Sequence, residues 1–309
     1  MPPVQQEGVI QTAQKITCDI IDQAEGERTR KRMRGVPGSS ASSSSSKGIA
    51  AIVGVGSNLG RSIARKFAHE GFSVAILSRD LGMLSRFADE IAREEKAQVF
   101  AIRIDCSDTR SIREAFEGVL SLGFVEILVY NAHSSNSDGN ALVPTNFTDI
   151  RPENFKKSLS VSTVGPFHCA QQVMSGMVEK GRGTILFTGC SASLNGMAGF
   201  SQLCCGKFGL RGLSQCLARE FETYGIHVAH VVIDGVVGPP RGPSSLQRTT
   251  LLGEQQRQSV VGGGEGTTSL MSTAVMDPDV VAQTYWHLHI QDRAAWTHEI
   301  DLRPSTVPS

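Results

Sequence analysis

The most constraining feature of this sequence is a short apolar run that ends in a cluster of glycines, over residues 48–56. The run reads GIAAIVGVG, and its small and β-branched side chains are typical of a strand buried on both faces. Residues 59–70 follow directly and carry apolar side chains at helical spacing. A buried strand, a glycine-rich turn and an amphipathic helix in this order predict the first unit of a parallel α/β sheet.

Apolar runs continue to alternate with helical stripes to the end of the chain. This alternation predicts a doubly wound, Rossmann-like parallel sheet with helices on both faces. Because proline cannot donate a backbone hydrogen bond, Gly165–Pro166 predicts an irregularity in one of the helices. Further strands are predicted over residues 72–77, 99–104, 125–130, 184–188, 226–233 and 296–302, and further helices over 84–91, 112–120, 154–178, 200–224 and 280–289.

Three segments differ in composition from the sheet-forming region. Residues 39–46 read SSASSSSS, and such a tract has no large apolar side chain to bury, so we expect residues 1–47 to be a disordered extension. Residues 48–303 then form the folded domain, and residues 304–309 a short tail. Residues 239–273 are rich in Gly, Ser and Gln, which predicts a long loop.

Charge and cysteine content narrow the class of protein. The chain has 309 residues with 30 basic and 30 acidic side chains, and this balance argues against nucleic acid or an anionic membrane as the main partner. No apolar run approaches the ~20 residues that span a bilayer, and the N-terminus lacks a secretory pattern. The seven cysteines lack C-x-x-C spacing, which favours unpaired thiols in a reducing compartment and a cytoplasmic location.

Two further features allow more than one interpretation. The basic cluster RTRKRMR at residues 28–34 could be a nuclear address or an RNA contact, although a solvated tail is the simpler interpretation, and nuclear or organellar targeting stays open. His287, His289 and His298 could suggest a metal. Because the first two point to different faces of a helix and the third lies on a strand, no metal site is predicted.

The glycine cluster has the composition of a phosphate-binding turn. Glycines let the backbone turn tightly and approach a pyrophosphate at a helix N-terminus, where free N–H groups and the helix dipole favour anions. The alternative is a plain strand-to-helix turn without a ligand. The residues expected to hold the pyrophosphate are Gly54, Gly56, Ser57, Asn58, Leu59 and Gly60.

Ser78 and Arg79 end the second predicted strand, where the adenosine ribose lies in a doubly wound fold. An acidic residue there would accept the 2′-hydroxyl of NAD, whereas an arginine would pair with the 2′-phosphate of NADP. Arg79 therefore favours NADP over NAD as the cofactor, unless it is only a surface arginine.

The order of motifs along the chain resembles the short-chain dehydrogenase/reductase family. After the glycine turn come Asp105-Cys-Ser-Asp behind the third strand, Tyr130-Asn131-Ala132 behind the fourth, and a helix that carries Lys207. The resemblance covers about residues 48–303 and implies a nicotinamide cofactor. The cofactor-binding positions that it adds are Asp105, Asn131, Ala132, Lys207 and Gly235.

The glycine turn departs from the family pattern at two positions. Val53 replaces a Thr, and Asn58 replaces the middle Gly. Because Asn tolerates positive φ better than most residues, we expect the turn to persist. Similar family members are dimers or tetramers through their two long helices, so the resemblance also implies a homodimer or homotetramer.

The catalytic positions depart further. Family members carry Tyr-x-x-x-Lys on a long helix, a Ser thirteen residues before the Tyr, and an Asn on the preceding long helix. Lys207 fits the Lys, but Leu203 stands at the Tyr position, Cys190 at the Ser position and Ser162 at the Asn position. The catalytic candidates are therefore Lys207, Cys190 and Ser162, and the pattern resembles a divergent subgroup that lacks the Tyr.

These departures leave two functions open. An NADP-dependent oxidoreductase could act on an unknown small carbonyl, alcohol or activated alkene, with water, Cys190 or a substrate group supplying the proton. The alternative is an inactive pseudo-enzyme that serves as a nucleotide-binding or partner-binding module. Cys204 lies three residues before Lys207, so the ammonium could lower its thiol pKa and make it an acid/base, although a buried structural thiol is the simpler interpretation.

Overall fold

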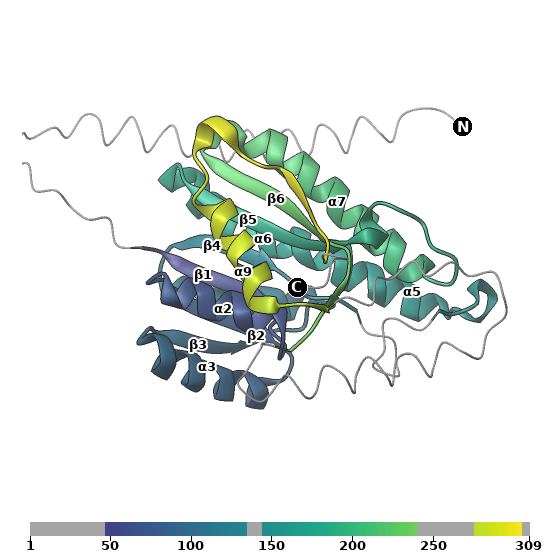
Figure 1. The fold of residues 1–309 in the computed structure, drawn as a ribbon, viewed down its shortest axis with the longest axis horizontal. Coiled ribbons are helices and arrows are strands. Elements are labelled where there is room, and N and C mark those ends of the chain that lie inside the picture. The colour runs from purple at the N-terminus through teal and green to yellow at the C-terminus, as the bar shows by residue number, and fades with distance from the viewer. Residues whose placement is uncertain (1–46, 135–143, 240–274, 305–309) are drawn as a thin grey trace, which may run out of the picture. The chain divides into compact units, whose positions relative to one another are not determined.

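The computed structural model describes residues 47–134, 144–239 and 275–304, and the predicted strands form one parallel sheet of seven strands there (Figure 1). Their order across the sheet is β3-β2-β1-β4-β5-β6-β9. The doubly wound prediction is therefore confirmed, and the order reverses between β1 and β4, where ligands bind in folds of this kind. The strands are β1 (Ile49–Val53), β2 (Ser73–Ser78), β3 (Val99–Arg103), β4 (Val125–Tyr130), β5 (Gly183–Cys190), β6 (Ile226–Ile233) and β9 (Glu299–Leu302).

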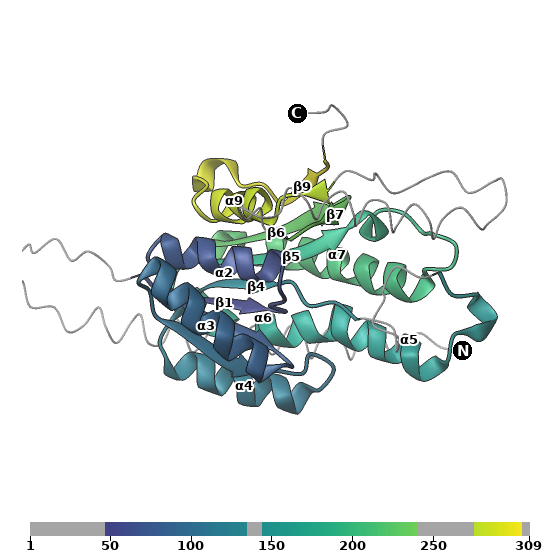
Figure 2. The same cartoon turned by 60° about the horizontal axis from the view of Figure 1, so that its bottom comes forward.

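Helices cover both faces of this sheet (Figure 2). The residues of β1 show how the faces divide: Ala50 and Ile52 pack with α2, α3 and α9, whereas Ala51 and Val53 pack with α4, α6 and α7. Strands buried on both faces are almost continuously apolar, which is why they are visible as runs in the sequence. The helices are α2 (Leu59–His69), α3 (Leu81–Glu95), α4 (Thr109–Ser121), α5 (Pro152–Leu159), α6 (Gly165–Lys180), α7 (Ser201–Phe221) and α9 (Pro278–His289).

The helix predicted over 154–178 is interrupted, as its Gly-Pro dipeptide indicated. A π-helical turn over Ser160–Val164 separates α5 from α6. Pro166 has no N–H to donate to the preceding turn, so the regular helical pattern breaks here. The buried hydroxyl of Tyr130 donates to the carbonyl oxygen of Val161, which anchors the π-helix at the carboxyl end of β4.

Capping residues and very short strands account for most other differences. Asp80 and Asp108 accept hydrogen bonds from backbone N–H groups of α3 and α4, so each helix begins three residues before its predicted start. A second sheet pairs β7 (Val236–Val237) with β8 (Val275–Met276). Two-residue strands have no periodicity to detect, and β9 begins at Glu299 instead of 296.

The predicted extension, the long loop and the tail fall almost entirely outside the described residues, so these remain predictions. Pro304, the first residue of the predicted tail, is described and packs beside Gly235. A Cβ at Gly235 would lie 2.9 Å from the Cδ of Pro304 and 3.1 Å from the Cε of Met276. The glycine is therefore required by packing at the end of β6, whatever it contributes to a cofactor site.

Helix α9 packs against α2 through aromatic rings and one histidine. Phe67 of α2 and Trp286 of α9 meet edge to face with 5.9 Å between ring centroids, and His289 lies 5.4 Å from the ring of Phe72. The Nδ1 of His289 lies 3.0 Å from the hydroxyl of Thr184. Burial among these groups lowers the pKa of His289 to about 4, so the imidazole is neutral at pH 7.

This burial predicts a loss of stability in mild acid. An unfolded histidine takes up a proton below pH 6.5, whereas His289 resists protonation down to about pH 4, so folding is disfavoured as the pH falls through this window. Between pH 7 and pH 5 the free energy of unfolding should fall by on the order of 2 kcal/mol through this residue. Urea denaturation at both pH values measures the change. His289→Gln should reduce it, and an unchanged pH dependence in that variant would contradict the assignment.

Candidate active site

The glycine turn after β1 meets the turn after β4 at backbone level. Gly54 has a φ of +86°, and a Cβ there would lie 2.3 Å from the backbone nitrogen of Ala132. The Nδ2 of Asn131 donates to the carbonyl oxygen of Gly54 at 3.0 Å, and the backbone N–H of Asn131 donates to Val53 at 2.8 Å. A side chain at residue 54 would therefore keep the two turns apart at the point where the strand order reverses.

No neighbouring atoms cover the middle of the same turn, whereas its end is tightly packed. A Cβ at Gly56 would have no atom within 4 Å, and Ser57 is exposed. Asn58 is the N-cap of α2 but makes no side-chain hydrogen bond to the helix, which leaves the first backbone N–H groups available to an anion. A Cβ at Gly60 would lie 2.8 Å from the Cα of Val55. Bare backbone at a helix N-terminus fits a pyrophosphate.

Asn58 corrects one expectation from the sequence. Its φ is −105°, so the explanation that Asn preserves the turn by tolerating positive φ is wrong. Instead, its Nδ2 donates to the carbonyl oxygen of Val237 in β7 at 3.2 Å, and its Oδ1 accepts from the Ser57 hydroxyl. The side chain that replaces the family's glycine thus links the turn to β7. The side chain of Leu59, the first residue of α2, is buried in the core, so only its backbone can contribute to the turn.

Ser78, Arg79 and Asp105 lie where β2 and β3 end, beside the glycine turn in the sheet order. The Ser78 hydroxyl is buried and has no hydrogen-bond partner among the described residues, so a ligand atom there would complete its hydrogen bonding. Burial opposes the ionisation of Asp105, but hydrogen bonds from Ser107 and the charge of Arg79 together lower its pKa. An exposed guanidinium beside a carboxylate fits an adenosine that carries a 2′-phosphate.

The side chain of Lys207, on α7, is buried and already makes a hydrogen bond. Its Nζ donates to the carbonyl oxygen of Thr188 in β5 at 2.8 Å, and the residue is 5% exposed. Burial lowers the pKa of Lys207, and the nearby Cys190 thiol opposes that shift. Ser162 is buried in the π-helix and packs against α7, because a Cβ at Gly206 would lie 2.7 Å from the Cβ of Ser162. Lys207 and Cys190 therefore lie close enough to interact, and Ser162 packs against Gly206, the residue that precedes Lys207.

Cys204 does not have the lowered pKa that a neighbouring ammonium would give. Burial raises the pKa of its thiol, and the adjacent Cys190 and Cys205 contribute in the same direction. Its burial and raised pKa favour the interpretation of Cys204 as a buried structural thiol over that of an acid/base. Leu203, at the Tyr position, is partly buried and has no proton to give.

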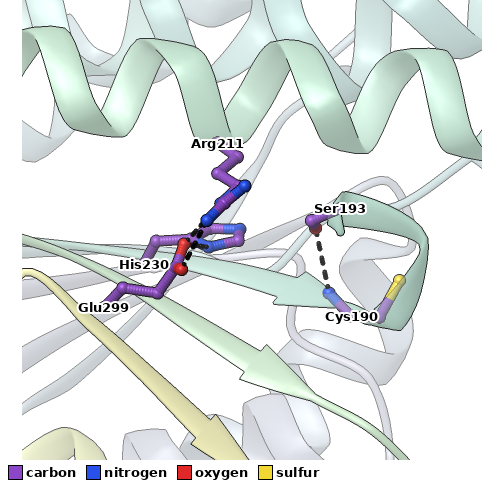
Figure 3. Close-up of polar contacts among 5 residues, drawn as sticks. All are labelled: Cys190, Ser193, Arg211, His230 and Glu299. Atoms are coloured by element: carbon purple, nitrogen blue, oxygen red, sulfur yellow. Dashed lines mark hydrogen bonds and ion pairs between the residues drawn. The ribbon is translucent and has the colours of Figure 1, made fainter. Parts of the chain in front are cut away.

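Sequence reasoning missed a group of polar side chains beneath α7, which we call the α7 polar cluster (Figure 3). It consists of Ser193 in the turn after β5, Arg211 on α7, His230 on β6 and Glu299 on β9. The available signal was an imidazole in a strand whose eight residues are all buried. Its contact with Glu299 joins residues 69 positions apart, which no local pattern predicts.

The histidines considered for a metal lie in other surroundings. His289 packs among aromatic rings, and His298, which precedes β9, meets the ring of His227 edge to face. Within the three described ranges, no three or more His, Cys, Asp or Glu side chains gather in a way that could hold a metal ion. None of the helices in that part of the chain is both long and apolar enough to cross a membrane.

Comparisons with known proteins identify the family. Residues 48–243 match the model for short chain dehydrogenases, so the chain belongs to the short-chain dehydrogenase/reductase family. A short-chain dehydrogenase/reductase of Armillaria gallica is 30% identical over 233 residues, which cover 69% of this chain and 85% of that protein. Sorbitol-6-phosphate 2-dehydrogenase of Escherichia coli is 29% identical over 209 residues, which cover 66% of this chain and 78% of that enzyme.

Solved structures share the fold. L-Sorbose reductase from Gluconobacter frateurii, solved with NADPH and L-sorbose, gives a TM-score of 0.69 at 19% identity and covers 85% of this chain and 98% of its own. A metagenomic short-chain oxidoreductase solved with NADP gives 0.65 at 21% identity and covers 84% and 97%. At these identities the likeness establishes the fold alone.

Proposed function

We propose that this chain is an NADP-binding oxidoreductase that acts on a small carbonyl, alcohol or activated alkene. The observation that carries the proposal is the glycine turn, in which Gly54 and Gly60 are required by close packing while Gly56 leaves bare backbone at the start of α2. The two structures of the same fold solved with NADP and NADPH support this cofactor. The cofactor would supply hydride transfer, and the chain would bind and orient it.

The side chains at the sheet edge divide into two ends of this proposed site. At the adenosine end, Arg79 would pair with the 2′-phosphate and Asp105 would contact the adenine. At the nicotinamide end, Lys207 would donate to the ribose through an N–H group other than the one it gives to Thr188. Cys190 would face the substrate as a weak donor. The full set proposed to bind the cofactor is Gly54, Gly56, Ser57, Asn58, Leu59, Gly60, Ser78, Arg79, Asp105, Asn131, Ala132, Lys207 and Gly235.

Two features of α7 favour a second function, that of an inactive nucleotide-binding or partner-binding module. Leu203 carries no proton, and Lys207 is buried against a backbone carbonyl. Loss of a general acid costs about 10²–10⁴ in rate, which leaves room for slow hydride transfer if Cys190, water or the substrate supplies the proton. Single-turnover oxidation of NADPH against a panel of carbonyl compounds separates the two functions, because only the oxidoreductase would consume the cofactor.

The cofactor assignment predicts a preference that depends on Arg79. The parent chain should bind NADPH more tightly than NADH by roughly 1.5–3 kcal/mol, which is the value of a charge-assisted hydrogen bond. Arg79→Asp should remove or invert this preference in calorimetric titrations with both nucleotides. Arg93→Asp makes the same charge change at an exposed position in the last turn of α3, and it should leave the preference intact. Equal affinities in the parent chain would show that Arg79 is only a surface residue.

The missing Tyr predicts that activity can be raised by restoring the family pattern. Residues 203 and 207 are one helical turn apart, so a tyrosine at 203 would lie beside the Lys207 ammonium, which should lower its phenol pKa. Leu203→Tyr with Cys190→Ser should raise NADPH-dependent reduction of a diketone or quinone by about 10²-fold or more, and the single Leu203→Tyr by less.

The same double variant combined with Lys207→Ala is the matched control and should lose the gain. A folded double variant that binds NADPH but stays inactive would contradict the oxidoreductase proposal and favour the binding module. A parent chain that already turns over rapidly would show that another group supplies the proton.

We further propose that the chain is a homodimer or homotetramer. Val164 in the π-helix, Phe167 on α6 and Phe208 on α7 are each exposed by more than two fifths of their surface. Exposed large apolar side chains on α6, on α7 and in the π-helix before α6 favour burial against a second copy. Because the cysteine spacing favours unpaired thiols in a reducing compartment, we propose a cytoplasmic location for this assembly.

A further inference from the structure

The α7 polar cluster contains a carboxylate held from two sides. Glu299 accepts two hydrogen bonds from Arg211, at 2.7 Å from Nε and 2.8 Å from Nη2. Its Oε2 also lies 3.0 Å from the Nδ1 of His230 (Figure 3). The hydrogen bonds from Arg211 are the main reason that the pKa of Glu299 is lowered, so the carboxyl group is ionised and can only accept.

The partners of His230 determine where its proton lies. The imidazole is 1% exposed, and burial lowers its pKa, assisted by the charges of Lys207 and Arg211 and opposed by Glu299. A neutral imidazole has one N–H, and the carboxylate of Glu299 accepts it, so the proton is on Nδ1. The Nε2 atom therefore has a free lone pair and needs a donor.

That donor is missing from the direct contacts of His230. Its Nε2 is buried and has no hydrogen-bond partner among the described residues. His227, on the same strand, differs, because each of its ring nitrogens has a protein atom within hydrogen-bond distance, at 3.0 Å (Leu288 carbonyl oxygen) and 2.9 Å (Thr297 carbonyl oxygen). Since buried polar groups are normally paired, the exception at His230 calls for a specific partner.

The hydroxyl of Ser193 is placed to provide this donor through one water. A Cβ at Gly189 would lie 2.1 Å from the Nε2 of His230 and 2.9 Å from the Oγ of Ser193, so both atoms pack against the same glycine, where a side chain would clash with them. Ser193 is fully buried, and its Oγ accepts the backbone N–H of Cys190 at 3.3 Å. An oxygen that accepts there still has its own proton to donate.

We infer that Ser193, His230 and Glu299 form a hydrogen-bond chain that positions Cys190. The backbone N–H of Cys190 donates to the Oγ of Ser193, the Ser193 hydroxyl donates to one water that in turn donates to Nε2 of His230, and Nδ1–H donates to Glu299. This series of hydrogen bonds connects the turn after β5 to the ion pair between Arg211 and Glu299. These are positioning residues, and their importance for catalysis rests on the proposed function of Cys190.

The same three residue types would serve a nucleophilic hydrolase, but the geometry excludes that use. The nucleophile of such an enzyme must reach a substrate carbonyl. Ser193 is fully buried, and its oxygen is held by the N–H of Cys190. The chain therefore acts on the backbone of the enzyme and not on a substrate.

Nitrogen NMR of the full chain labelled at histidine tests the chain of hydrogen bonds directly. The resonances of His230 are assigned by their disappearance in His230→Gln. They should show a protonated Nδ1 and an unprotonated, hydrogen-bonded Nε2 at pH 7. Ser193→Ala should shift the Nε2 resonance downfield, because the water that donates to the lone pair loses the hydroxyl that holds it. A proton on Nε2, or an Nε2 resonance that Ser193→Ala leaves in place, would overturn the inference.

The reactivity of the Cys190 thiol tests the positioning role. In a chain that also carries Cys18→Ser, Cys205→Ser and Cys216→Ser, alkylation of Cys190 by iodoacetamide should become several-fold faster with Ser193→Ala, because the turn opens more often. Glu114→Gln, which breaks an exposed ion pair with Arg110 on α4, is the control and should leave the rate unchanged.

If Ser193→Ala fails to fold, His230→Gln and His230→Phe decide the question. The first keeps an acceptor near the position of Nε2 and should retain slow alkylation, whereas the second should be several-fold faster, and equal rates would overturn the inference. Neither NMR nor alkylation requires NADPH or turnover. Failure of this hydrogen-bond chain is therefore distinguishable from failure of the proposed function.

Discussion

The close approach of Gly54 to the backbone of Ala132 is the contact on which the rest of the site depends. It brings the ends of β1 and β4 together, and Asn131 locks them with one hydrogen bond from its side chain and one from its backbone. Helix α2 then starts at the point where the strand order reverses, and its first N–H groups face the sheet edge. A methyl group at residue 54 would be incompatible with both the φ of +86° and this contact.

The sheet was predictable because its central strands are buried on both faces and form continuous apolar runs, whereas its helices are buried on one face and form periodic stripes. The glycine turn and the π-helical break at Gly165–Pro166 were predictable because glycine and proline have restricted conformational roles. The link from Asn58 to Val237, the pairing of β7 with β8 and the contact of His230 with Glu299 were not. Each joins residues far apart in the chain through single side chains or two-residue strands, which have no local pattern.

The two halves of the candidate site differ in how closely they follow the family to which the chain belongs. The half at β1, β2 and β3 has the close glycine packing, a Ser78 hydroxyl without a partner among the described residues, and an Arg79 whose charge helps to lower the pKa of Asp105. The half beneath α7 has Leu203 four residues before a buried Lys207, and the α7 polar cluster lies beneath the same helix (Figure 3). We therefore regard cofactor binding as the property that the fold supports most strongly, and the source of the proton as the property in which this chain departs from its family.

The central claim is that a nicotinamide dinucleotide lies over the turn between β1 and α2. Hydrogen–deuterium exchange of the full chain with and without NADPH tests it most directly, since it reports both binding and position. The account predicts slower exchange at residues 53–60, 78–79 and 131–132, and no change around Gly71 and Gly123, which precede β2 and β4 at the opposite edge of the sheet. Unchanged exchange at residues 53–60 under saturating NADPH, or protection confined to another surface, would contradict it.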